Sequence, residues 1–278
     1  MSDLSYVHSV VLGVVEGLTE FLPVSSTGHL TITEGLLGLR VDDPAVTSFT
    51  AVVQLGAIVA TLIYFWRDIA RLATAWFRGL RDPQARAERD YREAWYVIIG
   101  SIPLGIVGFV ARDLVTGPLR SLWVVAGGLL VWSGVMWLAE ARATQTKQER
   151  DLSLVDVLVV GVVQCVSLVP GVSRSGATIS AGLLRGVDRV TATRLSFFLA
   201  IPALTAAGLF ELKDVDTSVV GWGQMATGVV VAFVVAYASI AWLLRLVQRH
   251  PITVFVWYRV ALAAALAMLL GVGALSAT

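Results

Sequence analysis

The uncharged apolar segment at residues 46–66 constrains the fold more than any other feature of the chain. A helix crosses a hydrocarbon core of about 30 Å with roughly 20 apolar residues. Because 56% of the chain is hydrophobic and only 15% is charged, the water-soluble globular class is excluded. Five further apolar segments of comparable length lie at residues 94–111, 122–139, 195–210, 219–244 and 252–273. The sequence therefore predicts an all-α integral membrane protein with six transmembrane helices.

The chain also contains two related halves within a single membrane domain, residues 1–148 and 149–278. Residues 148 positions apart match in the pairs Gly13 and Gly161, Ser25 and Ser173, Gly28 and Gly176, and Ser48 and Ser196. Each half holds one broken apolar segment followed by three full spans. An odd number of crossings would turn the second copy upside down, so we expect an inverted-topology repeat.

Each half begins with an apolar segment that a proline and small polar residues interrupt. Pro23 precedes the letters VSSTG, and Pro170 precedes GVSRSG. The apolar run after each break is too short to cross a membrane. We therefore expect two half-helices joined at membrane depth, a re-entrant helical hairpin that protein or a water-filled cavity must surround. The alternative is a single kinked helix that crosses the membrane, which disagrees with the topology that the loop charges support.

Basic side chains in the loops orient the predicted helices. The segment between residues 66 and 94 carries Arg67, Arg71, Arg78, Arg81, Arg86, Arg89 and Arg92. The positive-inside tendency places this loop in the cytoplasm and the acidic segment 211–218 outside. The first hairpin would then enter from the outer side and the second from the cytoplasm. Because the basic residues are spread through loops rather than gathered in one patch, no nucleic-acid partner is expected.

Two carboxylates stand where the first hairpin should lie within the membrane. Glu16 and Glu20 are about one helical turn apart, so their side chains project from the same face. Paired carboxylates suit a hard divalent cation such as Mg²⁺ or Ca²⁺, and both are candidate metal ligands. An ionisable group among apolar residues is costly and usually functional. The alternative is that both residues face water beyond the membrane edge.

Hydroxyl groups stand where the second half-helix of each hairpin should begin, namely Ser25, Ser26 and Thr27 in the first copy and Ser173 and Ser175 in the second. Such residues commonly cap helices, but a helix N-terminus also offers N–H groups that bind phosphate. Arg174 favours phosphate binding, because a buried guanidinium needs an anionic partner and its planar fork matches phosphate oxygens. A structural ion pair of Arg174 with Glu16 or Glu20 is the main alternative.

Three further polar side chains lie in apolar surroundings. His29 shares a short segment with the hydroxyls and carboxylates, so proton transfer and hydrogen-bonded packing are both open for it. Gln54 and Arg259 lie within predicted full spans, where packing or counter-charge roles are expected, although Arg259 could add to the phosphate site.

The polar motifs EGLTEFLPVSSTGH and PGVSRSGAT closely resemble those of the undecaprenyl-diphosphate phosphatases, also called bacitracin-resistance proteins. The likeness extends over essentially the whole chain, including AVVQLGAIVA and SFFLAIPA. It implies a multi-pass enzyme of the bacterial inner membrane that removes the terminal phosphate of undecaprenyl diphosphate and so regenerates the lipid carrier for cell-wall sugar polymers. It also implies a divalent-cation requirement and an active site open to the outer face.

By motif position, the resemblance implies functional roles for Glu16, Glu20, Ser26, His29 and Arg174, with Ser25, Ser173, Ser175 and Thr178 beside them. Phosphoryl transfer needs positioning and charge neutralisation more than elaborate covalent chemistry. Ser26 is the preferred nucleophile, with Glu20 or His29 taking its proton. Attack by His29 or by a cation-bound water is the alternative.

The rival function is a transporter or flippase of an anionic polyprenyl phosphate lipid, because inverted repeats with broken helices are also typical of secondary transporters. The carboxylates would then couple to ions and Arg174 would hold the anionic substrate. The expected partners are undecaprenyl diphosphate and membrane lipid. The sequence leaves open the prenyl chain length, the preferred cation and the oligomeric state, including a homodimer.

Overall fold

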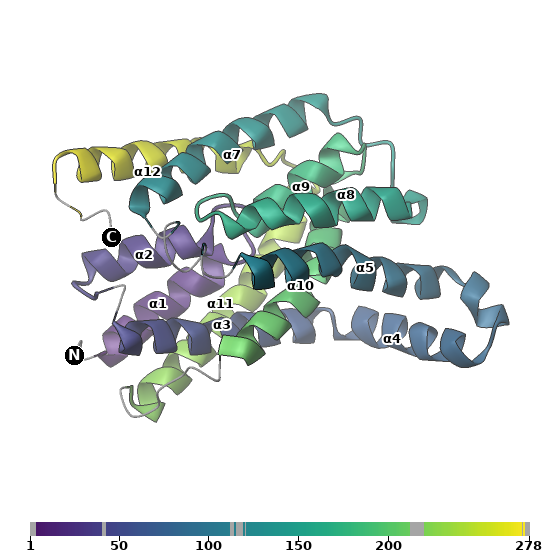
Figure 1. The fold of residues 1–278 in the computed structure, drawn as a ribbon, viewed down its shortest axis with the longest axis horizontal. Coiled ribbons are helices and arrows are strands. Elements are labelled where there is room, and N and C mark those ends of the chain that lie inside the picture. The colour runs from purple at the N-terminus through teal and green to yellow at the C-terminus, as the bar shows by residue number, and fades with distance from the viewer. Residues whose placement is uncertain are drawn as a thin grey trace.

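The fold was analysed in a computed structural model, which describes residues 4–40, 43–111, 114, 119, 121–211, 220–273 and 275. All the named elements within these ranges are helices, and they form one elongated bundle (Figure 1). This confirms the predicted all-α class. The acidic segment 211–218, which we expected on the outer side, lies outside the described residues beyond its first position.

Within the described ranges, six helices are long and apolar enough to cross a membrane, as predicted. They are α3 (Pro44–Tyr64), α5 (Arg89–Val110), α7 (Leu122–Arg142), α10 (Arg189–Glu211), α11 (Trp222–Val247) and α12 (Thr253–Gly271). The chain is therefore a multi-pass membrane protein. Helix α10 starts earlier than the predicted span, because Asp188 accepts hydrogen bonds from the backbone and hydroxyl of Thr191 and so caps a charged first turn. Pro202 does not interrupt it.

The arginine-rich segment after α3 differs from the loop that we expected. Residues Trp66–Arg81 form a helix, α4, which runs back to α5 through the short helix η1 (Gln84–Ala87) and packs against α5. Leu72 and Ala75 of α4 are buried. The Arg86 Nε–H donates to the Gly79 carbonyl at 2.9 Å, and Arg71 pairs with Asp90. Apolar residues at helical spacing between the arginines thus give this segment a packed face.

Both broken segments fold back on themselves. In the first half, α1 (Tyr6–Thr19) packs against α2 (Ser26–Leu36), and in the second half, α8 (Leu154–Gln164) packs against α9 (Arg174–Leu184), with η4 (Cys165–Leu168) between them. Helices α2 and α9 each have 11 residues and begin at positions that the repeat makes equivalent. This arrangement is compatible with two re-entrant hairpins, whose depth in a membrane and inverted orientation stay predictions.

Each hairpin packs on a long helix of the other half of the chain. Helix α1 lies against α11, and α8 lies against α5. A Cβ atom added to Gly17 would sit 2.8 Å from the Ala232 carbonyl oxygen, and one on Gly161 would sit 2.2 Å from that of Gly100. Glycine is therefore required at both contacts, as is usual where membrane helices approach closely. These contacts fix the two hairpins relative to one another.

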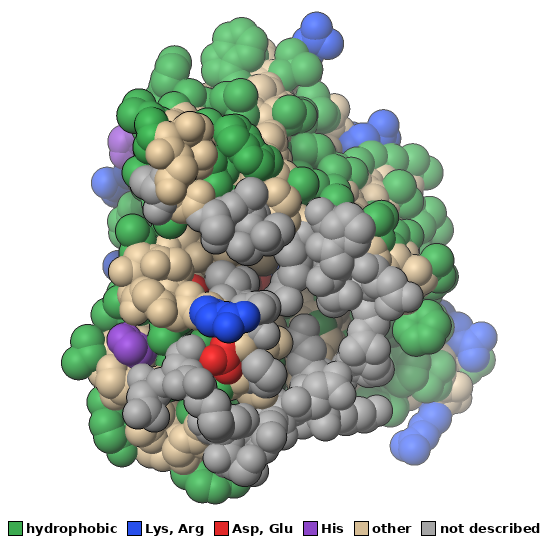
Figure 2. Space-filling model, turned by 60° about the vertical axis from the view of Figure 1, so that its left-hand side comes forward, with side chains coloured by type: hydrophobic (Ala, Val, Ile, Leu, Met, Phe, Trp, Pro, Cys, Tyr) green, Lys and Arg blue, Asp and Glu red, His purple; other side chains and the backbone are tan. Residues whose placement is uncertain are grey.

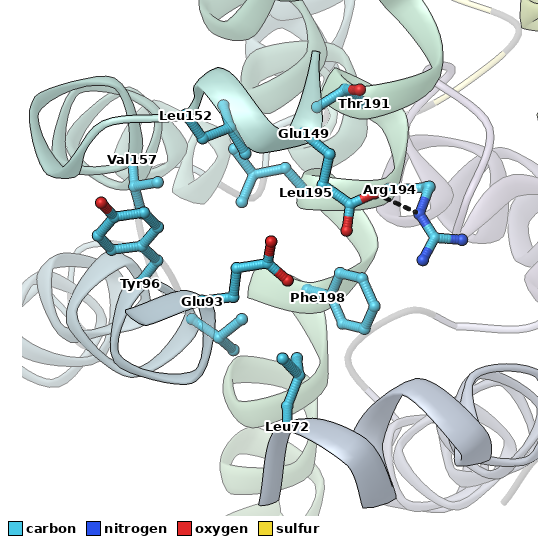
Figure 3. A pocket seen from close by; sticks show the side chains of 11 residues that line it. Leu72, Glu93, Tyr96, Glu149, Leu152, Val157, Thr191, Arg194, Leu195 and Phe198 are labelled. Atoms are coloured by element: carbon cyan, nitrogen blue, oxygen red, sulfur yellow. Dashed lines mark ion pairs between the residues drawn. The ribbon is translucent and has the colours of Figure 1, made fainter. Parts of the chain in front are cut away.

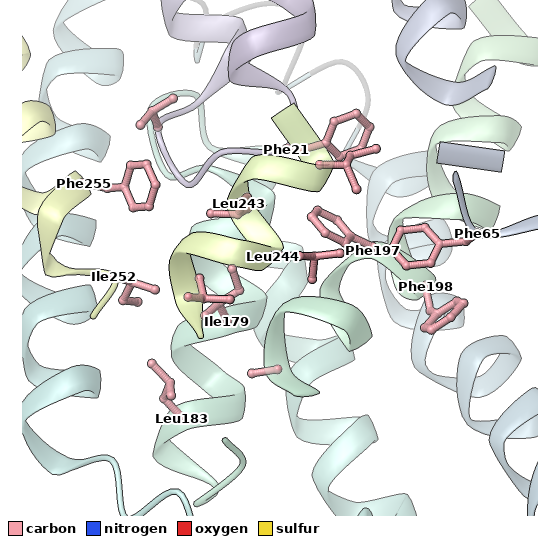
Figure 4. Close-up of a cluster of buried hydrophobic side chains, with 14 of the residues drawn as sticks. Phe21, Phe65, Ile179, Leu183, Phe197, Phe198, Leu243, Leu244, Ile252 and Phe255 are labelled. Atoms are coloured by element: carbon pink, nitrogen blue, oxygen red, sulfur yellow. The ribbon is translucent and has the colours of Figure 1, made fainter. Parts of the chain in front are cut away.

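An aromatic cluster fills the centre of the bundle beneath the first hairpin (Figure 4). Phe21 is fully buried and meets Phe197 edge to face with ring centroids 5.6 Å apart. Phe65, at the junction of α3 and α4, contacts both Phe197 and Phe198. Because Phe21 directly follows Glu20, this packing anchors the end of α1.

The outer surface is strongly apolar. Figure 2 shows hydrophobic side chains across wide areas of one face, with only a few charged side chains among them. Large apolar residues such as Phe109, Val131 and Trp257 are exposed on the long helices. An exposed apolar surface of this kind suits contact with lipid tails.

Candidate active site

The turns of the two hairpins touch, although they are far apart in the sequence. The backbone N–H of Gly171 donates to Ser25 Oγ at 3.2 Å. Arg174 Nη2 donates to Glu20 Oε1 at 3.3 Å. The two interrupted segments therefore bring their polar residues into one cluster, which we call the hairpin site and define as Glu16, Glu20, Ser25, Ser26, His29, Ser173, Arg174, Ser175, Thr178 and Ser196.

Both turns use an unusual backbone conformation at equivalent serines. Ser25 has φ 76° and Ser173 has φ 74°, values in the left-handed region that ordinary residues rarely adopt. Each serine directly precedes a half-helix. Ser173 caps α9 in the usual way, accepting from the Gly176 N–H at 3.2 Å. Ser25 turns instead to the other hairpin, so α2 has no side-chain cap and its positive end faces the site.

Glu20 is the central acceptor of the hairpin site. The Ser26 hydroxyl donates to its Oε2 at 2.6 Å, while Arg174 donates to its Oε1. Glu20 is only 8% exposed, and the Arg174 side chain is 10% exposed. Charged groups removed from water need such partners. The Glu20 carboxylate thus connects the Ser26 hydroxyl with the Arg174 guanidinium.

The two terminal nitrogens of the Arg174 guanidinium are held by hydrogen bonds. Its Nη1 donates to the Ser196 carbonyl at 3.2 Å, and its Nη2 serves Glu20. The ion pair that the sequence offered as an alternative is therefore present. Within the described part of the chain, the Arg174 Nε–H is buried without a hydrogen-bond partner. The pair with Glu20 consequently leaves this donor available to an anion.

The other hydroxyls of the second hairpin form a small network around Arg174. Ser173 Oγ lies 3.2 Å from Ser175 Oγ, and the Thr178 hydroxyl lies 2.7 Å from Ser196 Oγ. Thr178 also bonds back to the Arg174 carbonyl at 2.9 Å. These contacts hold the first turn of α9 in place. Thr27, in contrast, is exposed on α2, and its carbonyl accepts from Thr31.

His29 is engaged on both ring nitrogens. Its Nδ1 lies 2.7 Å from the Ser25 carbonyl, which can only accept, and its Nε2 lies 2.6 Å from the Tyr258 hydroxyl. The His29 and Tyr258 rings also stack with centroids 5.6 Å apart. With Nδ1 as the donor, Nε2 is the acceptor for Tyr258. Both ring nitrogens thus bind groups other than Ser26, whose hydroxyl contacts the Glu20 carboxylate.

The donor set at the first hairpin fits a hard cation in part. Glu16 is 2% exposed and lies one turn before Glu20, whose N–H donates to the Glu16 carbonyl at 3.0 Å. No cluster of three or more His, Cys, Asp or Glu side chains occurs in the described ranges. Two carboxylates with a neighbouring hydroxyl suit Mg²⁺, which usually takes one or two carboxylates and completes its shell with water and substrate phosphate.

Arg259 of α12 has a structural place rather than one in a phosphate site. It is fully buried, and its Nε donates to Ser133 Oγ at 3.1 Å. Its Nη1 donates to the Pro23 carbonyl of the first turn at 3.0 Å, and its Nη2 to the Gly171 carbonyl of the second at 2.9 Å. Further Nη2 contacts reach the carbonyls of Gly128, Leu129 and Val172. One guanidinium thus ties both turns to α7.

Sequence reasoning missed Ser196 and Tyr258 as members of this environment. Ser196 matches Ser48 in the repeat, and its place in the SFFLAIPA motif was the available signal. Tyr258 is adjacent to Arg259 in the sequence but lacks a pattern that would connect it with His29. Only the packing of α12 near both turns brings it there.

A separate cavity lies between α4, α5 and α10 (Figure 3). The carboxylates of Glu93 and Glu149 point into it, and Arg194 pairs with Glu149 across a distance of 3.7 Å. Its volume of about 30 Å³ holds one or two water molecules. It is too small for a diphosphate, and no residue of the hairpin site lines it.

Comparisons with known proteins agree with the motifs. The family model described as bacitracin resistance protein BacA matches residues 9–265. Undecaprenyl-diphosphatase 1 of Frankia alni is 57% identical over 278 residues, which cover 100% of both chains. Undecaprenyl-diphosphatase of Acidothermus cellulolyticus is 58% identical over 258 residues, 92% of this chain and 94% of that protein. Undecaprenyl-diphosphatase 1 of Streptomyces coelicolor is 56% identical over 276 residues, 99% of each chain. The resemblance is thereby confirmed, and the chain belongs to the bacitracin resistance protein BacA family.

Proposed function

We propose that the chain is an undecaprenyl-diphosphate phosphatase, which hydrolyses its substrate to undecaprenyl phosphate and inorganic phosphate. The names of the three relatives support this activity. The observation that carries it in this chain is the contact of Glu20 with both Ser26 and Arg174 in one partly buried site. A nucleophile, a base and a phosphate-binding cation are the groups that phosphoryl transfer requires.

In the proposed reaction, Ser26 Oγ attacks the terminal phosphorus while its proton passes to Glu20 Oε2. The bond from that phosphorus to the bridging oxygen breaks, and undecaprenyl phosphate leaves with the bridging oxygen. Glu20 passes this proton to the leaving phosphate and becomes a carboxylate again. Water then attacks the phosphoserine and gives a proton to Glu20. The bond from phosphorus to Ser26 Oγ breaks, inorganic phosphate departs, and Glu20 returns the proton to Ser26 Oγ. Direct attack by water on the substrate is the competing route, and in it Glu20 would take the proton from water.

Arg174 and the uncapped end of α2 supply positive charge for the phosphate oxygens. The Arg174 Nε–H and the backbone N–H groups of the half-helices point to where charge develops in the transition state. In an enclosed site these fixed dipoles are worth more than they would be in water. Ser173, Ser175 and Thr178 would keep the arginine in position.

Glu16 and Glu20 would hold a divalent cation, either Mg²⁺ or Ca²⁺. Such a cation, when bound, neutralises charge on the diphosphate. Glu16 would then act mainly as a ligand, whereas Glu20 would divide its two oxygens between ligation and the proton of Ser26.

The isoprenoid chain would lie along the apolar outer surface of the long helices while the diphosphate enters between the hairpins. We place the enzyme in the bacterial cell membrane with the hairpin site open to the outer side, in agreement with the arginine-rich α4 on the cytoplasmic side. In this position the enzyme would return the lipid carrier to cell-wall synthesis and so confer bacitracin resistance. A homodimer stays a prediction that light scattering in detergent would test.

Release of phosphate by the purified protein in detergent tests the proposal. We expect the wild type to release inorganic phosphate from a C15 or C55 prenyl diphosphate, and Arg174→Ala to release at least 10²-fold less. A transporter of the same lipid needs two compartments and would release none. Equal activity of the wild type and Arg174→Ala would contradict the proposed site.

A further inference from the structure

The last residue of α8, Gln164, is a buried amide with an unusual lack of partners. Its side chain is 0% exposed. Within the chain as described, neither Nε2 nor Oε1 has a hydrogen-bond partner. Leaving such a group unsatisfied destabilises a fold, because the lost hydrogen bonds to water are not replaced. A glutamine at this position therefore indicates a polar partner from outside the described part of the chain.

Gln164 occupies the position in the second half of the repeat that Glu16 occupies in the first. The letters GVVE end at Glu16 and the letters GVVQ end at Gln164, 148 positions later. The second hairpin thus carries a neutral amide where the first carries a carboxylate. The two side chains have nearly the same shape, but only the amide can donate hydrogen bonds.

The register of α8 against α9 brings Gln164 to the level of the first turn of α9, which begins at Arg174. The Arg185 Nε–H donates to Asp156 Oδ1 at 2.8 Å, and Val160 shares a cluster with Ala181. Both helices rise about 1.5 Å per residue, so a move of four residues forward along α8 corresponds to a move of four residues back along α9. Starting from Val160 and Ala181, one such move places Gln164 level with residue 177. Thr178 is adjacent to that position, and Arg174 is one turn away on the same side.

The register thus brings the Gln164 amide toward the first turn of α9, where the buried Nε–H of Arg174 also lacks a partner within the described residues. A phosphate oxygen accepts hydrogen bonds from both kinds of group. We propose that the Gln164 amide donates to a phosphate oxygen of the prenyl diphosphate beside Arg174, and so belongs to the substrate-binding residues. This inference rests on the proposed function.

The difference between the two hairpins then has a chemical reason. Glu16 faces the side that binds a cation, where a negative charge is favourable. Gln164 faces the side that binds the anion, where a carboxylate would repel the substrate. The repeat would thus supply one half-site for the cation and another for the phosphate.

The test compares Gln164→Met, which keeps the shape but removes the donor, with Gln164→Glu. We expect Gln164→Met to lower kcat/KM for a prenyl diphosphate about 10- to 100-fold, while its melting temperature stays equal to or above that of the wild type. Gln164→Glu should lower kcat/KM further. Gln54→Met, a matched change in α3, should leave kcat/KM unchanged.

A second measurement uses inorganic pyrophosphate as the probe. Pyrophosphate should raise the melting temperature of the wild type and raise that of Gln164→Met less. Wild-type kcat/KM in Gln164→Met would overturn the inference, since a buried water would then be the partner. Wild-type kcat/KM in Gln164→Glu would also overturn it. If Gln164→Met does not fold, the kcat/KM of Gln164→Glu tests the inference in its place. If the wild type releases no phosphate, the proposed function fails, and the pyrophosphate shift still tests the anion contact.

Discussion

Ser26 Oγ lies 2.6 Å from Glu20 Oε2, across the turn that interrupts the first hairpin. The distance is that of a short hydrogen bond to a carboxylate. The other oxygen of the same carboxylate accepts from Arg174 of the second hairpin. The carboxylate that binds the proposed nucleophile is therefore also the one that contacts the second hairpin.

We predict that Ser26→Ala lowers phosphate release by about 10³-fold or more with little change in melting temperature, because it removes the attacking oxygen. Release from a C15 prenyl diphosphate measures the effect, and phosphoserine at Ser26 in quenched wild-type reactions would support it. Near-normal turnover in Ser26→Ala together with inactivity of Glu20→Ala would instead favour direct attack by water.

Arg174→Lys keeps the charge but loses the planar fork. We expect kcat/KM to fall about 10- to 100-fold, since a lysine cannot serve Glu20, the Ser196 carbonyl and a phosphate together. Arg245→Lys, at an exposed position of α11, is the matched control and should behave as the wild type does. Full activity in Arg174→Lys would mean that charge alone is needed there.

Removal of divalent cations tests the role of Glu16. EDTA should abolish phosphate release, and added Mg²⁺ or Ca²⁺ should restore it. Glu16→Gln should raise the cation concentration needed for half-maximal activity about tenfold or more, because one anionic ligand is lost. Activity that EDTA leaves intact in the wild type would exclude the cation.

Arg259→Met should destabilise the protein by about 3 kcal/mol or more, because it leaves buried carbonyls of both turns without a donor. Denaturation in detergent measures the loss. Arg259→Lys should recover part of the stability, whereas Ser133→Ala, which removes one of the partners, should cost only about 1 kcal/mol. Wild-type stability in Arg259→Met would show that the turns hold without this side chain.

Acid should destabilise the start of α8 in the second hairpin, because it protonates Asp156. Burial alone would raise the pKa of this carboxyl, but hydrogen bonds from Lys147, Ser153 and Arg185 outweigh it and lower the pKa to about 2 from the ordinary 3.8. The stabilisation is therefore complete above about pH 4 and is lost as the pH falls toward 2. Stability of the wild type should drop over this window by about 1 kcal/mol more than that of Asp156→Asn. Parallel curves for the two proteins would contradict this.

Much of this architecture is predictable from composition and pattern. Long uncharged segments can only become buried or lipid-facing helices, so α3 and α7 follow directly from the sequence. The breaks at Pro23 and Pro170 are equally predictable, because a proline followed by several small polar residues disfavours a continuous apolar helix, whereas Pro202 alone does not interrupt α10. The repeat then predicted that Ser25 and Ser173 would begin equivalent half-helices, as they do.

Other contacts depend on tertiary packing that no local pattern carries. The charged spacing of α4 is typical of a cytoplasmic loop, and only its fit against α5 makes it a packed helix. His29 was assigned an open role because its partner, Tyr258, is 229 positions away. Arg259 raised the prospect of a phosphate ligand, whereas backbone carbonyls from three segments bind its guanidinium. Long-range pairs of this kind escape prediction from sequence periodicity.

The backbone at Ser25 and Ser173 would suit glycine better than any residue with a side chain, by about 1 kcal/mol at each place. Glycine would relieve this backbone strain, but it would also remove the side-chain oxygens that accept from the N–H groups of Gly171 and Gly176. The loss of such a hydrogen bond is comparable to the strain that glycine would relieve. Serine at these two points therefore exchanges an unstrained backbone for hydrogen bonds that join the hairpins and start α9.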